Sequence, residues 1–278
     1  MCEVIIEDGT GQTKSRLVIW NQPGNDVSGI VARSEKLVRT TEKLLGGEVF
    51  HYHTKLIPKQ PRTGGVFQWH QDYGYWYNNG NLTPDINTVY IAVDRCDTDN
   101  GCIEASPPFL CSSLGRLSRL IGDRAFFYDR KARFGNVGDR EVMPGSHRCG
   151  RINHAPVGGQ QGADLDRVEL LKKRFPIIPV VLDPGDTLIF HSNIVHKSNA
   201  NASERRRWAL LVSYNTKENE SSVKHHHSQY VPLDVVPDSA ILECTNFEDI
   251  SGKDFIDPEG DKTVGKPKYI SEEEQKNM

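Results

Sequence analysis

His70 and Asp72 stand two positions apart in the stretch VFQWHQDYGYW, Val66–Trp76, which is otherwise aromatic, apolar and amide-bearing. If Gln68–Tyr73 is extended, alternate residues point to the same side, and the two side chains offer a nitrogen and an oxygen ligand to one point. A hydrogen-bonded core histidine followed by a turn residue gives the same short pattern. A metal site therefore requires a third ligand from another part of the chain.

His196 supplies that ligand in the stretch DPGDTLIFHSNIVHKSNANASERRRWALLVSYN, Asp183–Asn215. Pro184 and Gly185 predict a turn, a short strand follows, and His196 comes just beyond it. Two imidazoles and one carboxylate on one face, with the opposite face open, are typical of non-haem Fe(II) sites for oxygen chemistry. Closed zinc sites prefer thiolates and fill four positions. His191, on the preceding strand, is the weaker ligand candidate.

An Fe(II) oxygenase needs a source of electrons, and a bidentate 2-oxoacid, which is a common source, requires a cation for its far carboxylate. The planar guanidinium of arginine matches a carboxylate and stays charged. Arg207 lies eleven residues after His196, at the head of the apolar run RWALLVSYN. A solvated run over 205–207 is the alternative interpretation, and strand alternation allows at most two of these arginines to point inward.

The elements that must position these residues follow a helix-then-strands order. Apolar spacing predicts a helix over Val27–Leu45 that ends at Gly46 and Gly47. Runs rich in β-branched and aromatic residues then predict strands, namely GEVFHYHTKLI, NTVYIAVDRC, FPIIPVVL, DTLIFHS and RWALLVSYN. This order favours a mainly β fold, a barrel or jelly roll with supporting N-terminal helices. We expect residues 1–250 to form a single domain. Ser251–Met278 is charge-rich and predicts a loosely held polar tail.

Composition excludes several classes of partner. The chain has 278 residues, with 34 basic and 37 acidic side chains and a formal net charge of −3, so no basic excess favours nucleic acid. It shows no secretory signal, no membrane-length apolar run and no peroxisomal signal at its C-terminus, so we expect a cytoplasmic protein with a small-molecule partner. Its six cysteines form no CxxC pair, which fits reduced thiols.

Five features recur together along the chain, namely WHQD, DNGCIE, PGSHRCGR, PGDTLIFHSNIVHKS and the arginine eleven residues after the second histidine. As a set they resemble the phytanoyl-CoA dioxygenase family of Fe(II)/2-oxoglutarate oxygenases. The resemblance runs from about Val49 to Tyr214 and implies a double-stranded β-helix, the cupin-like jelly roll. WHQDYGYWYNNG and GRINHAPVGGQQGAD are most similar to the branch of free L-proline trans-4-hydroxylases and, more distantly, to ectoine hydroxylases.

The resemblance also implies roles for individual residues. His70, Asp72 and His196 would ligate Fe(II), while Arg207 and Ser198 would hold the distal carboxylate of 2-oxoglutarate. Lys55 and Tyr90 match positions that line the co-substrate pocket, and Trp76 matches a substrate-contacting position, although an aromatic in an aromatic run is more often packing. The implied reaction is hydroxylation of a small molecule, with a free amino acid such as L-proline as one candidate, using O2 and with ascorbate as reductant.

The chain departs from the family between DNGCIEA and MPGSHR, where Ser106–Val142 is a predicted insertion. A lid over the site is one interpretation; retained non-coding or alternatively spliced sequence is the favoured one, because long connections inside compact domains are uncommon. If the insertion disrupts a strand, the alternative is an inactive metal-binding jelly-roll protein. A zinc hydrolase with the same three ligands ranks last, since it lacks a paired general base.

The other histidines receive structural interpretations. His225–His227 predict a surface loop, and His51 and His53 predict pocket or core positions. His147 and Arg148 in PGSHR predict a turn.

Overall fold

The computed structural model describes residues 4–7, 13–104, 125–127, 146–157, 160–175, 177 and 179–256. The predicted insertion over 106–142 therefore lies outside the described residues, apart from 125–127. Most of the predicted polar tail, 257–278, also lies outside them.

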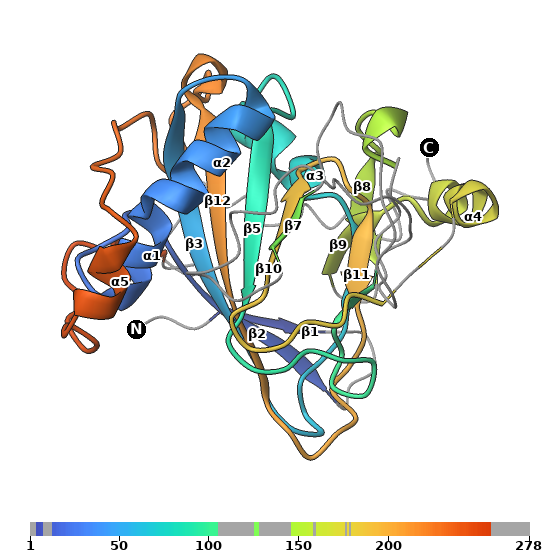
Figure 1. Cartoon of the computed structure of the whole chain (residues 1–278). Coiled ribbons are helices and arrows are strands. Elements are labelled where there is room, and N and C mark those ends of the chain that lie inside the picture. Colours follow the sequence, from blue (N-terminus) through green and yellow to red (C-terminus); the bar gives the residue numbers. More distant parts are fainter. Residues whose placement is uncertain are drawn as a thin grey trace.

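A seven-stranded sheet forms the centre of the molecule, in the order β1-β2-β3-β12-β5-β10-β7 (Figure 1). Its strands are β1 (Val4–Glu7), β2 (Lys14–Trp20), β3 (Val49–Lys59), β5 (Ile86–Ala92), β7 (Ala125–Phe127), β10 (Thr187–His191) and β12 (Arg207–Thr216). All neighbouring strands are antiparallel except β10 and β7, which are parallel.

Two smaller sheets lie beside it. A three-stranded sheet has the order β4-β11-β6, and β8 pairs with β9. The strands are β4 (Phe67–His70), β6 (Ile103–Glu104), β8 (His154–Val157), β9 (Gln160–Ala163) and β11 (His196–Ser198). The α-helices are α1 (Val27–Arg33), α2 (Glu35–Leu45), α3 (Asp72–Trp76), α4 (Leu165–Arg174) and α5 (Ser239–Glu243), and η1 (Tyr77–Asn79), η2 (Ser146–Cys149) and η3 (Lys217–Asn219) are single 3-10 turns.

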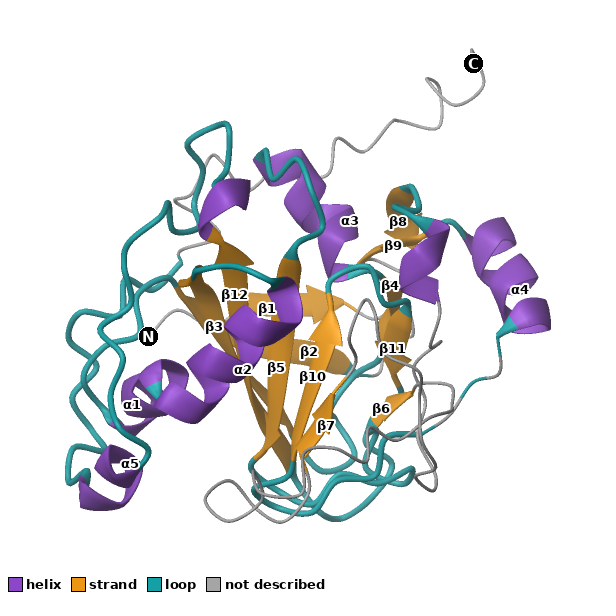
Figure 2. Cartoon of the chain, turned by 45° about the horizontal axis from the view of Figure 1, so that its top comes forward, coloured by secondary structure: helices purple, strands orange, loops and turns teal. Residues whose placement is uncertain are grey.

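Strand alternation gives the central sheet two different faces. On the outer face, Val89, Ile189 and Val212 pack with Leu37 and other apolar residues of α1 and α2. Figure 2 shows α2 lying across the sheet, with α1 beside it at the edge. On the inner face, Tyr90, Phe190 and Leu211 join a second core cluster that includes Ile103 of the small sheet. The inner face therefore looks toward the small sheet, and any site between the sheets is built from alternate residues of β3, β5, β10 and β12.

The prediction of a mainly β fold is confirmed, while the double-stranded β-helix assignment stays a prediction. The predicted helix over Val27–Leu45 is two helices that meet at Ser34, and it ends at Gly46 in the left-handed conformation (φ 84°) as expected. FPIIPVVL was predicted as a strand, which was wrong for its described part. Only isolated bridges occur there, such as that of Leu182 with Cys96.

The predicted loose tail is also wrong over its described start. Lys253 is buried and its Nζ lies 2.7 Å from Oδ2 of buried Asp26, at the start of α1. Phe255 bridges Trp20 of β2, and Ile256 is buried. Composition could not reveal this, because one buried ion pair and two apolar contacts are enough to hold a short charged segment. Among the described residues, no helix is both long and apolar enough to cross a membrane.

Candidate active site

The pairing of β4 with β11 brings the two site histidines together. His196 lies directly opposite His70 in the antiparallel register, and their ring centroids are 4.1 Å apart. The predicted extended run over 68–73 ends early, because β4 stops at His70 and α3 begins at Asp72. Gln71 between them keeps an extended backbone (φ −112°, ψ 136°), so Asp72 still returns to the side of His70. His70 and Asp72 therefore lie on the same side as predicted, although Asp72 stands at the start of a helix and not on the strand.

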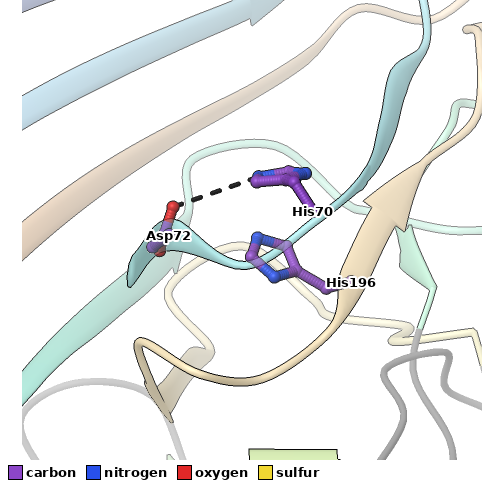
Figure 3. A group of neighbouring side chains, drawn as sticks. All are labelled: His70, Asp72 and His196. Carbon is purple, nitrogen blue, oxygen red and sulfur yellow. Dashed lines mark ion pairs between the residues drawn. The ribbon is translucent and has the colours of Figure 1, made fainter. Parts of the chain in front are cut away.

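One ligand atom from each of His70, Asp72 and His196 lies within 4.8 Å of the others, and Figure 3 shows the three side chains converging. The Nδ1–H of His70 donates to the carbonyl of Gln68 at 2.7 Å, and that of His196 donates to the carbonyl of Ile194 at 3.0 Å. Each ring is thereby held in the tautomer that presents its Nε2 lone pair. This arrangement fits a metal ion, whose histidine ligands are usually oriented through their second nitrogen.

The protonation states also suit a metal. Burial first, and then His196, lowers the pKa of His70 to about 3, and burial lowers the pKa of His196. Burial alone would raise the pKa of Asp72, but Lys55 and the two imidazoles hold it below its ordinary value. At neutral pH the group therefore offers two neutral imidazoles and one carboxylate, and no ligand must lose a proton before metal binds.

Residues outside the three ligands fix the carboxylate and its connection. The hydroxyl of Thr88 on β5 donates to Oδ2 of Asp72 at 2.8 Å. The side chain of Gln71 is fully buried, accepts from the backbone N–H of Ile152 and donates to the carbonyls of Gly150 and Asn193. His154 accepts from the backbone N–H of Gln71 at 2.9 Å. These hydrogen bonds were not predicted from the sequence, because most of the bonded residues are far apart along the chain.

A second polar group surrounds Arg207, at the start of β12. Its guanidinium is 1% exposed and donates to the hydroxyl of Tyr90 at 2.9 Å and to the carbonyl of Gly101 at 2.7 Å, while its Nε has no partner. In the part of the chain that the structure describes, no carboxylate pairs with it. Arg205 and Arg206 are exposed and pair with Asp97 and Asp94, so one arginine of the run points inward. A buried guanidinium without an anion is costly unless a ligand supplies one.

Lys59, which belongs to none of the predicted motifs, joins this group. It lies opposite Arg207 in the pairing of β3 with β12 and is 1% exposed. Its ammonium donates to the hydroxyl of Ser198 at 2.9 Å and to the carbonyl of Asn199. A signal was available in the sequence: Lys59 follows Lys55 by four residues, so both share one face of a strand.

The structure does not bring Lys55 and Trp76 to Arg207. Lys55 lies opposite Leu211, four residues along β3 from Lys59, and its Nζ is 5.5 Å from the ring centroid of Trp76. The ring of His53 is 5.4 Å from that of Trp76. The residues predicted from the sequence therefore form three groups. They are the metal group (His70, Asp72 and His196), the group of Arg207, Ser198 and Tyr90, and a third group, with Lys55 and Trp76, at the other end of the inner face.

The prediction of a surface loop at His225–His227 was wrong. His227 is buried, with its ring 4.5 Å from that of His53 and 4.7 Å from that of Tyr52. His225 and His226 are half-buried beside it. The polar surroundings in the sequence suggested exposure, but the segment after β12 returns across the start of β3 and places its third histidine in the interior.

Comparison with protein families gives one match. The model of the phytanoyl-CoA dioxygenase (PhyH) family matches residues 11–108 and 140–209. The residues between these two segments fall inside the predicted insertion.

Among curated proteins, the chain is 26% identical over 219 residues to L-proline trans-4-hydroxylase of Streptomyces griseoviridis, covering 78% of this chain and 72% of that protein. It is 24% identical over 228 residues to ectoine dioxygenase of Bordetella parapertussis, covering 78% of this chain and 62% of the relative. The chain thus spans less than two thirds of the ectoine enzyme.

Solved structures share the fold at lower identity. EctD from S. alaskensis, crystallised with 2-oxoglutarate and 5-hydroxyectoine, has a TM-score of 0.56 at 19% identity, covering 76% of this chain and 64% of that one. The epimerase SnoN, solved with Fe3+, alpha ketoglutarate and nogalamycin RO, has a TM-score of 0.55 at 14% identity, covering 84% of this chain and 79% of that one. Because the family model matches more than half of the residues, this chain belongs to the phytanoyl-CoA dioxygenase (PhyH) family of dioxygenases.

Proposed function

We propose that this protein is an Fe(II)- and 2-oxoglutarate-dependent dioxygenase that hydroxylates a small molecule, with free amino acids such as L-proline as the first candidates. The observation that carries the proposal is that the protein has both the metal group and Arg207, a buried cation that has no carboxylate partner among the described residues. A metal site alone would fit other reactions. The additional buried guanidinium fits a dicarboxylic co-substrate bound between the two.

In this proposal, His70, Asp72 and His196 hold iron, and Thr88 fixes the carboxylate through its hydroxyl. Bound iron and 2-oxoglutarate together supply the oxidising chemistry, with O2 as co-substrate and ascorbate keeping the iron reduced. Arg207 and Ser198 bind the distal carboxylate, Tyr90 orients the guanidinium, and Lys59 adds a second cation. The protein's contribution is to orient these groups and to exclude water from them.

The facing of the two sheets supports a double-stranded β-helix, and the likeness to EctD is a likeness of fold. The relative from Streptomyces griseoviridis supports L-proline as a test substrate, while the 26% identity leaves the substrate open to experiment. The fold does not fix the reaction type, since SnoN, which has a similar fold, is an epimerase.

The test measures succinate released from 2-oxoglutarate by the full chain with Fe(II), ascorbate and air, with and without a panel of free amino acids. We expect one panel member to stimulate succinate release and to gain one oxygen atom by mass spectrometry. Arg207→Met should weaken 2-oxoglutarate binding by about a hundredfold, because it removes a charged, bidentate donor.

Arg206→Met is the matched control, since Arg206 is the exposed neighbour paired with Asp94. It should leave 2-oxoglutarate affinity unchanged. Binding of 2-oxoglutarate without any succinate, from folded and iron-loaded protein, would favour the inactive metal-binding alternative. Absence of 2-oxoglutarate binding would overturn the proposal.

A further inference from the structure

The residues of β3 that point to the inner face of the sheet are polar, with one exception. His53, Lys55, Ile57 and Lys59 share this face by strand alternation, opposite Ser213, Leu211, Ala209 and Arg207 of β12. Lys59 lies at the Arg207 end. Lys55 is four residues away, roughly 13 Å along a strand. The two lysines therefore serve different parts of the site, with the metal group between the sheets beside them.

Lys55 has no anion of its own. It is half-buried, and its ammonium makes no hydrogen bond and no ion pair with any residue that the structure describes. Burial lowers the pKa of Lys55, and the charge of Asp72 opposes that effect. Asp72 is committed to the metal in the proposed function, so Lys55 keeps an uncompensated charge in a sheltered position. Such a charge is costly unless a ligand offsets it.

The charges of the proposed co-substrate complex do not offset Lys55 either. Iron(II), the carboxylate of Asp72 and the two carboxylates of 2-oxoglutarate carry one negative charge in total. Arg207 balances that charge, and Lys59 adds a further positive charge on the same side. The group therefore keeps a net positive charge on the side of Lys55, which a carboxylate of the substrate would offset.

The surroundings of Lys55 show what kind of group fits. His53 is fully buried, and neither of its ring nitrogens has a hydrogen-bond partner. Burial first, then Lys55 and His227, holds the pKa of His53 well below its ordinary value, so the ring is neutral with one N–H to donate. Its ring packs 4.5 Å from that of buried His227 and 5.4 Å from that of Trp76. The ammonium of Lys55, the neutral N–H of His53 and the indole ring of Trp76 together suit a small molecule that has a carboxylate and a compact apolar part.

Trp76 connects this third group to the metal. It lies four residues after Asp72 on α3, one helical turn away on the same side of the helix. Its ring is 2% exposed and lies beside both Lys55 and His53. A molecule bound against Trp76 would therefore extend from Lys55 toward the metal group.

We propose that Lys55, His53 and Trp76 form the substrate subsite, that Lys55 binds a carboxylate of the substrate, and that the protein therefore acts on carboxylate-bearing small molecules. The inference rests on the proposed function and deepens it. It moves Lys55 from the co-substrate pocket, where the family resemblance put it, to the substrate.

The test uses the full chain loaded with Fe(II) and 2-oxoglutarate without oxygen, so that binding is measured without turnover. Calorimetric titrations compare the free amino acids with their primary amides, beginning with L-proline and L-prolinamide. We expect at least one acid to bind at least tenfold more tightly than its amide. Lys55→Met should weaken binding of that acid by about tenfold to a hundredfold and abolish the preference over the amide, since a charge-assisted contact is lost.

Further variants separate the explanations. Lys55→Arg keeps the charge and should keep most of the acid preference, whereas Lys55→Gln, which also removes the charge, replaces Lys55→Met if the methionine variant does not fold. Lys224→Met is the matched control, because Lys224 is exposed beside the histidine run, and it should leave acid binding unchanged. His53→Leu should weaken acid binding by a smaller factor than Lys55→Met, because it removes a neutral donor.

The outcomes distinguish this inference from the proposed function. If no acid binds more tightly than its amide, or if Lys55→Met retains the preference, the carboxylate subsite is wrong. If Lys55→Met loses 2-oxoglutarate affinity as Arg207→Met does, Lys55 belongs to the co-substrate site and the inference is overturned while the proposed function stands. Failure of the unaltered protein to bind 2-oxoglutarate would overturn the proposed function itself.

Discussion

At the scale of single residues, the metal group depends on hydrogen bonds that the ligands themselves do not reveal. Thr88 holds Oδ2 of Asp72 at 2.8 Å, which leaves Oδ1 on the side of His70. We predict that Thr88→Val, which keeps the shape and removes the hydroxyl, weakens Fe(II) affinity by about tenfold to a hundredfold. Anaerobic metal titration measures this. Thr88→Ser retains the hydroxyl and should bind iron almost normally, whereas equal losses in both variants would mean that packing is responsible.

His51 gives a residue-scale prediction for pH. Burial lowers the pKa of His51 to about 4 from an unfolded value near 6.5, and its ring bonds the carbonyl of Asn21 and the hydroxyl of Thr54. Between these values the unfolded chain binds more protons, so the free energy of unfolding falls as pH drops below about 6.5. The contribution lost at pH 5 is about 2 kcal/mol for this one group.

Urea unfolding at pH 7 and pH 5 tests this effect. His51→Gln should lose about 2 kcal/mol less than the unaltered protein between the two pH values, although other buried histidines keep part of the slope. An identical pH dependence in the variant would show that His51 is not a titrating contributor.

At the scale of elements, α3 must lie very close to the start of β8, where His154 stands. A Cβ added to Gly74 would lie 2.0 Å from Cε1 of His154, whose Nε2 accepts from the backbone N–H of Gln71. We predict that Gly74→Ala lowers the free energy of unfolding by about 1–3 kcal/mol, because the ring or the helix must shift. Iron affinity should fall as well, because His154 bonds the backbone N–H of Gln71, which stands between the ligands His70 and Asp72.

Gly47→Ala is the matched control for chemical unfolding, because a Cβ there meets nothing within 4 Å. It should change the free energy of unfolding by a few tenths of a kcal/mol at most. If Gly74→Ala is equally neutral, the close approach of α3 to His154 is not a constraint on the fold.

At the scale of the whole molecule, a bound metal would connect segments that are far apart in the chain. His70 ends β4, Asp72 begins α3 and His196 begins β11. Metal at a hundred times its Kd stabilises the folded state by about 2.7 kcal/mol, and 1 kcal/mol shifts Tm by roughly 2–4 °C for a chain of this size. We therefore expect Fe(II) or Co(II) to raise Tm by about 5–10 °C, measured anaerobically by thermal denaturation.

A chelator should reverse that shift, and His196→Ala should abolish it, because two remaining ligands hold a metal weakly. A shift of equal size in His196→Ala would place the stabilising metal somewhere other than this group.

The residues of the metal group could be predicted without a structure. His70, Asp72 and His196 were predicted from ligand type and spacing. Arg207 was predicted from the need for a cation at the far carboxylate of a 2-oxoacid and from its position eleven residues after His196. The structure buries Asp72, His196 and Arg207, leaves His70 partly exposed, and brings the three ligands together. The main strands β3, β5, β10 and β12 were also predicted, since their β-branched and aromatic runs are strong local signals.

The lysine that lies beside Arg207 and the position of the histidine run could be learned only from the folded chain. Lys55 and Lys59 are equivalent by alternation, and the register of β3 with β12 alone puts Lys59 opposite Arg207. His227 is buried because the segment after β12 packs against Tyr52 and His53, more than a hundred residues earlier in the chain. Register and long-range packing arise from the sum of many weak contacts, so no local pattern of residues encodes them.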